Sequence, residues 1–213
     1  MGTINKGILG GFSGKVGSVI GSSWKGIQVM RSLPTASKRK KSSKSIEHQA
    51  HFKKVIDVIS KGGVIFKQGF APMAKGQTAF NAAFSRNFSV FSMKSGKLDI
   101  AYDKFALSNG SLGNLKNFKA TVNDLGTLSL DWNPTNVERF DNRDLMVQCL
   151  VATDDFESVM CYLNVDLVSA HHCGVELLDE MKGKVLHVYV FYSLPGVFRA
   201  DAISDSSYCK VVV

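Results

Sequence analysis

The sequence predicts an α+β protein in which a basic, glycine-rich N-terminal region precedes helices and an antiparallel β-sandwich. Three observations lead to this fold class. Glycines are concentrated at the start of the chain, apolar residues recur with a helical period over residues 45–91, and the pattern changes to short β-type runs after residue 97. The 213 residues, 45% of them apolar, can bury a substantial core. We therefore expect two parts, residues 1–97 and 98–213.

The first part opens with eight of the nineteen glycines in 26 residues. β-branched and aromatic residues run between these glycines, so we expect a β-hairpin with strands at residues 15–20 and 24–31 and a turn at 21–23. A two-stranded hairpin alone is marginal in water. This hairpin is therefore expected to pack on another surface, in the same chain or in a copy of it.

The positive charge is concentrated in the same region. Residues 1–54 hold eleven Lys and Arg and one acidic residue, whereas residues 55–213 hold fifteen Lys and Arg and seventeen Asp and Glu. Lys38, Arg39, Lys40, Lys41 and Lys44 form a basic loop interleaved with serines. Such a run is typical of a solvated loop, and it also suits a polyanion, whose binding releases counterions, or an acidic protein partner.

Two to three helices are expected next. Ser45 is a suitable N-cap for a helix that ends at Gly62-Gly63, and a shorter helix is expected over residues 64–70. A third is expected over residues 77–91, where phenylalanines recur on one face and predict packing rather than a ligand site.

The second part has the pattern of an antiparallel sandwich. Its strands are expected at residues 98–102, 104–107, 118–122, 127–132, 144–152, 158–164, 175–178, 184–192 and 208–213. A turn centred on Asp155 would pair Cys149 with Cys161, and likewise Val147 with Leu163 and Val151 with Val159. The runs Leu128–Trp132 and Leu186–Phe191 resemble the second and sixth strands of fibronectin type III-like domains, which implies an immunoglobulin or fibronectin type III-like sandwich.

No motif for catalysis or metal binding is present in the sequence. The four cysteines contain no C-x-x-C pair, and neighbouring His171 and His172 would point in opposite directions on a strand. His48 and His51 would share one helix face without a further ligand nearby. The Gly10–Val16 run lacks the spacing and the Ser or Thr of a phosphate-binding loop. We expect no enzyme activity, no cofactor and no metal site.

Three segments resemble the opening of an uncharacterised bacterial family of unknown function. They are Gly7–Gly17 (GILGGFSGKVG), Ser23–Gly26 (SWKG) and Met30–Pro34 (MRSLP), and Leu107–Leu112 (LSNGSL) is similar further along the chain. The resemblance implies a bacterial origin and one architecture of basic N-terminal region, helices and sandwich. It implies no activity, cofactor or catalytic residue.

These observations favour a non-enzymatic structural or interaction protein, including one that self-assembles into a particle or filament. The alternative is a sequence-indifferent nucleic-acid-binding protein that uses the basic N-terminal region. A cytoplasmic location is expected because the start lacks a signal peptide, with an exported or virion-like particle left open; no apolar run is long enough for a membrane span. The candidate interaction residues are Trp24, Arg31, Lys38, Arg39, Lys40, Lys41 and Lys44.

Overall fold

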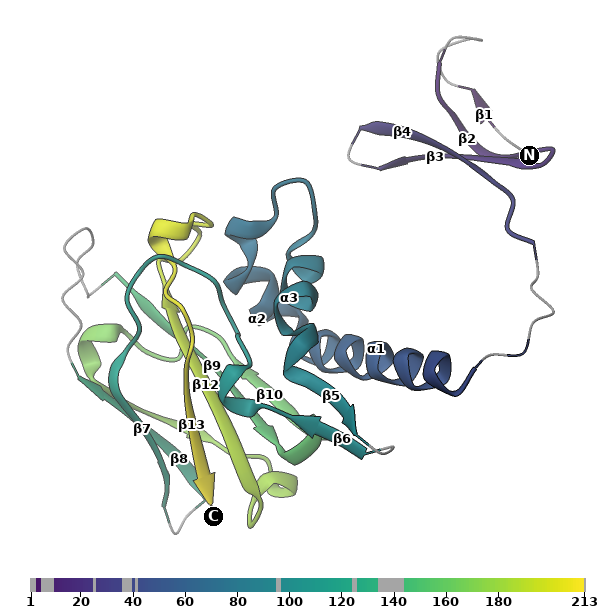
Figure 1. Ribbon diagram of the computed structural model, residues 1–213. Coiled ribbons are helices and arrows are strands. Elements are labelled where there is room, and N and C mark those ends of the chain that lie inside the picture. Colours follow the sequence, from purple (N-terminus) through teal and green to yellow (C-terminus); the bar gives the residue numbers. More distant parts are fainter. Residues whose placement is uncertain are drawn as a thin grey trace. The chain divides into compact units, whose positions relative to one another are not determined.

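The computed structural model describes residues 3–4, 10–24, 26–35, 40, 42–94, 97–123, 126–133 and 144–212. The chain divides into two compact units, residues 1–42 and 43–213. Unit 1 is a small sheet, and unit 2 contains the helices and the sandwich (Figure 1).

Unit 1 contains an antiparallel sheet with the strand order β1-β2-β3-β4. The strands are β1 (Thr3–Ile4), β2 (Phe12–Val16), β3 (Val19–Trp24) and β4 (Ile27–Ser32). Gly17 and Gly26 lie between strands with φ angles of 58° and 81°, which glycine adopts without strain. The predicted turn at residues 21–23 is wrong, because these residues lie inside β3 and pair with β4.

Unit 2 begins with the helices that the apolar periodicity predicted. They are α1 (Ser43–Lys61), α2 (Gly63–Gly69) and α3 (Ala79–Asn87), with 3₁₀ turns at Ala71–Met73 and Phe88–Val90. The hydroxyl of Thr78 caps α3 by accepting a hydrogen bond from the Asn81 amide at 3.1 Å. A short hairpin, β5 (Phe91–Lys94) and β6 (Lys97–Ile100), leads to a 3₁₀ turn at Tyr102–Lys104.

Seven strands follow and form two antiparallel sheets. They are β7 (Lys116–Val122), β8 (Thr127–Asn133), β9 (Met146–Thr153), β10 (Val159–Tyr162), β11 (His172–Glu176), β12 (Val185–Ser193) and β13 (Ser207–Val212). One sheet has the order β10-β9-β12-β13 and the other β11-β8-β7. Leu128–Trp132 lies in the second of these strands and Leu186–Phe191 in the sixth, as the fibronectin type III-like resemblance implied. The α+β fold class is confirmed.

The β10-β9-β12-β13 sheet is the middle layer of unit 2. In Figure 1 the helices lie on one side of this sheet and β7 and β8 on the other. Leu150, Tyr189 and Phe191 pack toward the helices, and Cys149, Val151 and Val188 pack toward the second sheet. Strands β9 and β12 are therefore buried on both faces, which accounts for their nearly continuous apolar sequences.

The predicted pairing of β9 with β10 is wrong by one residue. Cys161 lies opposite Leu150, and Cys149 lies opposite Tyr162. The connecting turn holds Asp155 and Phe156 at positive φ angles of 54° and 51°, and this left-handed geometry shifts the register. Cys149 and Cys161 consequently point to opposite faces of the sheet.

Smaller differences concern the ends of elements. Residues 104–107 were expected to form a strand, but they follow the 3₁₀ turn without pairing. The strand expected at 175–178 lies at 172–176 instead. The predicted division at residue 97 follows the change from helical to β-type sequence. The compact units instead divide after residue 42, since the helices share a core with the sheet.

Candidate interaction surface

The candidate interaction residues are distributed over both units. Trp24 ends β3 and Arg31 lies in β4, so the sheet of unit 1 holds both. Lys40 is exposed, and Lys44 is exposed in the first turn of α1 in unit 2. Lys38, Arg39 and Lys41 lie outside the described residues. Trp24 and Arg31 therefore lie in the same sheet, and their role in an interaction stays a prediction.

The strand register defines two faces of this sheet. Ile20 pairs with Arg31, Ser22 with Val29, and Trp24 with Ile27, so these six residues share one face, which we call the tryptophan face. Lys15 pairs with Ile20 and belongs to the same face. The tryptophan face therefore combines an apolar centre with cationic side chains at one end.

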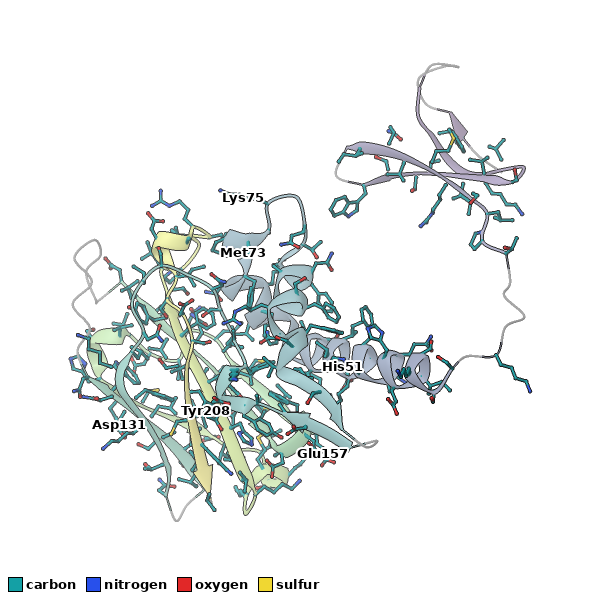
Figure 2. All side chains as sticks on the ribbon, viewed as in Figure 1. His51, Met73, Lys75, Asp131, Glu157 and Tyr208 are labelled. Atoms are coloured by element: carbon teal, nitrogen blue, oxygen red, sulfur yellow. The ribbon has the colours of Figure 1, made fainter. Side chains whose placement is uncertain are left out.

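The apolar residues of unit 1 have no core to pack into. Ile27 is 61% exposed, Met30 69% and Trp24 46%. Both buried apolar clusters of the described structure consist of unit 2 residues alone. Figure 2 shows the described side chains of the N-terminal strands projecting from their sheet.

Gly21 explains part of the glycine content of this sheet. A Cβ atom at this position would lie 2.2 Å from the carbonyl oxygen of Phe12 and 2.6 Å from its ring. Gly21 therefore lets the Phe12 ring lie across β3 on the face opposite the tryptophan face. The predicted turn at residues 21–23 includes Gly21, but glycine is required there because ring and backbone approach closely.

The excess charge of the chain belongs entirely to unit 1. Residues 1–42 contain eight Lys and Arg and no Asp or Glu, which equals the formal net charge of +8. Residues 43–213 contain eighteen basic and eighteen acidic residues. An anionic surface would therefore be attracted to unit 1 much more than to unit 2.

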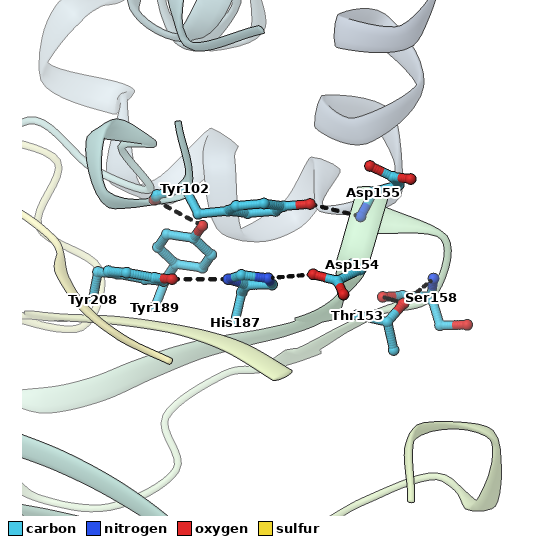
Figure 3. Close-up of polar contacts among 8 residues, drawn as sticks. All are labelled: Tyr102, Thr153, Asp154, Asp155, Ser158, His187, Tyr189 and Tyr208. Atoms are coloured by element: carbon cyan, nitrogen blue, oxygen red, sulfur yellow. Dashed lines mark hydrogen bonds and ion pairs between the residues drawn. The ribbon is translucent and has the colours of Figure 1, made fainter. Parts of the chain in front are cut away.

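A polar cluster in unit 2 was missed by sequence analysis. His187 in β12 is buried, with its Nδ1 atom 2.9 Å from the Tyr208 hydroxyl and its Nε2 atom 2.9 Å from Asp154 (Figure 3). Tyr102 stacks on the imidazole, and its hydroxyl accepts a hydrogen bond from the Asp155 amide at 2.8 Å. The one sequence signal was a histidine within an apolar strand.

Burial determines the ionisation of this cluster. It lowers the pKa of His187, although the hydrogen bond to Asp154 acts in the opposite direction. Burial likewise raises the pKa of Tyr208 to about 12. Both nitrogens of the imidazole are occupied and its ring is covered. The cluster therefore joins the β9–β10 turn to β12 and β13.

The other predicted histidine groups are separate from this cluster. His48 and His51 share one helix face, as expected, and both contact the ring of Phe88. The Nδ1 atom of His172 lies 2.8 Å from a carboxylate oxygen of Asp131 on the surface of the sandwich. In the part of the chain that the structure describes, no three potential ligands gather as a metal site.

A model of a family of unknown function, DUF6266, matches residues 11–206. The chain belongs to this family. The DUF6266 match therefore extends from Gly11 in unit 1 to Ser206, directly before β13, and includes strands β2, β3 and β4 of the N-terminal sheet. The sequence-based resemblance to a family of unknown function is confirmed.

Two solved structures similar to this DUF6266 chain are domains of rat CD45 and of chicken CNTN1. Rat CD45 extracellular domains d3–d4 match with a TM-score of 0.34 and 9% identity, over 50% of this chain and 52% of that one. The FN1–FN3 domains of chicken CNTN1 match with a TM-score of 0.36 and 7% identity, over 57% of this chain and 42% of that one. The chain thus spans about half or less of these structures. No curated protein matches it.

The segment Leu107–Leu112 of this DUF6266 chain has a structural role. The Ser108 hydroxyl donates to the Ser204 carbonyl at 2.7 Å, and the Gly110 amide donates to Asp205 at 3.1 Å. A Cβ atom at Gly110 would lie 1.8 Å from the carbonyl oxygen of Ile203. This segment therefore joins the helical part to the β12–β13 connection.

Among the described residues, no helix is long and apolar enough to cross a membrane.

Proposed function

We propose that this DUF6266 chain is a non-enzymatic structural or interaction protein whose N-terminal sheet docks onto another subunit. The observation that carries the proposal is the contrast between the two units. Unit 2 has two buried apolar clusters, whereas the apolar side chains of unit 1 are exposed on a sheet without a core. A sheet of this kind gains stability when a second layer covers it.

The tryptophan face has the composition of an interface. Trp24, Ile27 and Val29 are large and exposed. Burying each of them completely would contribute about 1.5–3 kcal/mol. Tryptophan and arginine are also the residues that most often dominate binding energy at protein interfaces. The partner is a subunit of an assembly, either another copy, as in a filament or particle, or a different protein.

Photo-cross-linking in cells that produce the full-length protein tests this proposal. A photoreactive amino acid replaces Ile27 on the tryptophan face, and the matched control replaces Lys184, which is exposed on the sandwich. We expect a covalent adduct of discrete mass from position 27 and none from position 184. Mass spectrometry of the adduct distinguishes a second copy from another protein. If position 27 gives no discrete adduct, docking through this face is wrong.

Nucleic-acid binding is the second candidate, because the whole charge excess lies in residues 1–42. Each phosphate contact made by these cations would release counterions, so affinity would fall steeply with salt. Fluorescence anisotropy with duplex DNA at about 50 and 200 mM salt measures this dependence. Salt-steep, sequence-independent binding would support the candidate, and no binding at the lower salt concentration would exclude it.

A further inference from the structure

We infer that β4 is an open edge strand that binds an extended acidic segment of a partner protein by adding it as a fifth strand to the N-terminal sheet. The inference rests on the proposed docking function and names the kind of partner. Extended peptides commonly bind in this way, with backbone hydrogen bonds supplying affinity and alternate side chains supplying specificity.

The two edges of the N-terminal sheet differ in what they offer. Strand β1 has two residues, whereas β4 has six. All six residues of β4 are exposed and pair with β3 in one unbroken register. Proteins usually block edge strands with a bulge, a proline or a very short length. Residues 27–32 contain no bulge and no proline, and Arg31 is the one charged residue among them.

The register shows which backbone groups of β4 face outward. The Leu33 amide donates to the Ser18 carbonyl at 2.7 Å, so this pair is hydrogen-bonded across the hairpin. Hydrogen-bonded pairs recur at every second residue of an antiparallel ladder. Arg31, Val29 and Ile27 therefore direct their N–H and C=O groups toward β3. Those of Gln28, Met30 and Ser32 point away from the sheet and are available to a new strand.

The outer strands of unit 2 are less suitable as templates. Strand β7 has a register shift between Lys116 and Lys119 and lies against β13. Strand β10 has four residues, and β11 has five, with Gly174 in the middle. Strand β13 is as long as β4, but it lies against β7 and only two of its six residues are exposed. The regular edge strand whose residues are all exposed is therefore β4, in unit 1.

Charge identifies the occupant of this edge as acidic. Residues 1–42 carry eight basic residues and no acidic residue. Pairing β4 with the β4 of a second copy would bring together two segments that each carry eight basic residues and no acidic residue. Unit 2 of a second copy is balanced in charge and offers no compensating attraction. An acidic segment of a different protein satisfies both the backbone groups and the charge.

The alternating directions of the β4 side chains further define the sequence of this segment. Ile27, Val29 and Arg31 lie on the tryptophan face at every second position. Side chains of an added strand on the same face would lie beside them. The segment should therefore place apolar or β-branched residues next to Ile27 and Val29, and an acidic residue next to Arg31.

A proline substitution distinguishes the contribution of the backbone edge of β4 from the contribution of the Met30 side chain. Because the Met30 amide points outward, Met30→Pro removes an outward donor without removing a β3–β4 hydrogen bond. Met30→Ala is the matched control, since it shortens the side chain and keeps the amide. The probe is a fluorescent peptide of about seven residues in which two successive residues of one face are Val or Thr, to lie beside Ile27 and Val29, the next residue of that face is Glu, to lie beside Arg31, and the residues of the other face are Glu. A Lys-for-Glu peptide and duplex DNA serve as comparison ligands.

We expect the acidic peptide to bind the full-length chain and the Lys peptide not to bind. Met30→Pro should weaken binding by about tenfold or more, and Met30→Ala by no more than about threefold. Equal loss in both variants, or no loss in Met30→Pro, would overturn the edge assignment. No binding of the acidic peptide would overturn the acidic occupant. Light scattering could instead show that the full-length chain is a dimer and that Met30→Pro dissociates it. This result would also overturn the acidic occupant, because the edge would then bind a second copy.

These outcomes are distinct from failure of the proposed function. A discrete cross-linked adduct at position 27 together with unchanged peptide binding by Met30→Pro would retain docking and reject edge pairing. Absence of both the adduct and peptide binding would reject docking itself. A third outcome is that the acidic peptide does not bind, whereas DNA binds equally to the unsubstituted chain and to Met30→Pro. The basic residues of unit 1 would then serve to bind a polyanion instead of an acidic segment.

Discussion

The ring of Tyr102 lies flat on the imidazole of His187, with ring centroids 3.6 Å apart and an interplanar angle of 8°. This contact covers the histidine that joins Asp154 in the β9–β10 turn to Tyr208 in β13 (Figure 3). The 3₁₀ turn at Tyr102 and the middle sheet are therefore connected through this imidazole, and the stability of unit 2 should respond to its protonation.

The first prediction concerns pH. Burial, assisted by Lys210, lowers the pKa of His187 in the folded chain, and Asp154 opposes this shift. The unfolded chain, with a pKa near 6.5, then takes up the proton first as the pH falls, so folded-state stability is lost below that value. The loss for one proton cannot exceed about 1.4 kcal/mol per pH unit. Urea unfolding between about pH 7.5 and 5.5 measures it.

His187→Phe provides the control for this prediction. The ring still stacks on Tyr102 but does not titrate, so the free energy of unfolding should change less over the same pH range. Equal pH dependence in the two proteins would show that other groups, such as the carboxylates, are responsible.

The second prediction concerns the turn that shifts the β9–β10 register. Asp155 and Phe156 adopt left-handed backbone angles, which cost about 1–3 kcal/mol each. Lys61 of α1 offsets part of this cost by donating to the carbonyl oxygens of Phe156 and Glu157, both at 3.1 Å. Lys61→Met should lower the free energy of unfolding by about 1–2 kcal/mol. Lys53→Met, at an exposed position of the same helix, should change it by less than about 0.5 kcal/mol.

The third prediction concerns the contact of Gly110 with the β12–β13 connection. A methyl group at Gly110 would overlap the Ile203 carbonyl, so Gly110→Ala should destabilise unit 2 by about 1–3 kcal/mol. Gly113→Ala adds the same group three residues later, where no atom lies within 4 Å. Thermal unfolding should separate the two variants clearly. Similar melting temperatures would contradict the close contact at Gly110.

The fourth prediction tests the strand register directly. Cys149 lies opposite Tyr162, so Tyr162→Cys should allow mild oxidation to link the introduced thiol to Cys149. The unsubstituted protein should not link Cys149 to Cys161, since their side chains lie on opposite faces. Peptide mapping without reduction distinguishes these products. A Cys149–Cys161 link in the unsubstituted chain would support the pairing that the sequence predicted.

Local patterns were sufficient to predict most elements of unit 2. The helical spacing before Gly62 and the apolar strands arise from short-range preferences that the fold retains. The N-cap expected at Ser45 is wrong, because α1 already begins at Ser43. The register of β9 and β10 could not be predicted in the same way, because it depends on left-handed angles at Asp155 and Phe156. Buried contacts of the Phe156 ring and hydrogen bonds from Lys61 make those angles possible.

Tertiary proximity accounts for the remaining differences. Gly21 looked like a turn residue because only the fold shows the Phe12 ring lying across it. The His187 cluster unites residues from three separate regions of the chain, so no spacing could reveal it. The concentration of charge and exposed apolar residues at the N-terminus, by contrast, was visible in the sequence.

The charge balance of residues 43–213 has a consequence for colloidal behaviour. With eighteen basic and eighteen acidic residues, this unit has no formal net charge to keep its copies apart in solution. The cationic sheet therefore supplies the mutual repulsion of the whole molecule. Neutralising that sheet by an acidic ligand would bring the complex close to its isoelectric point, so occupancy of β4 would also favour condensation of neighbouring molecules.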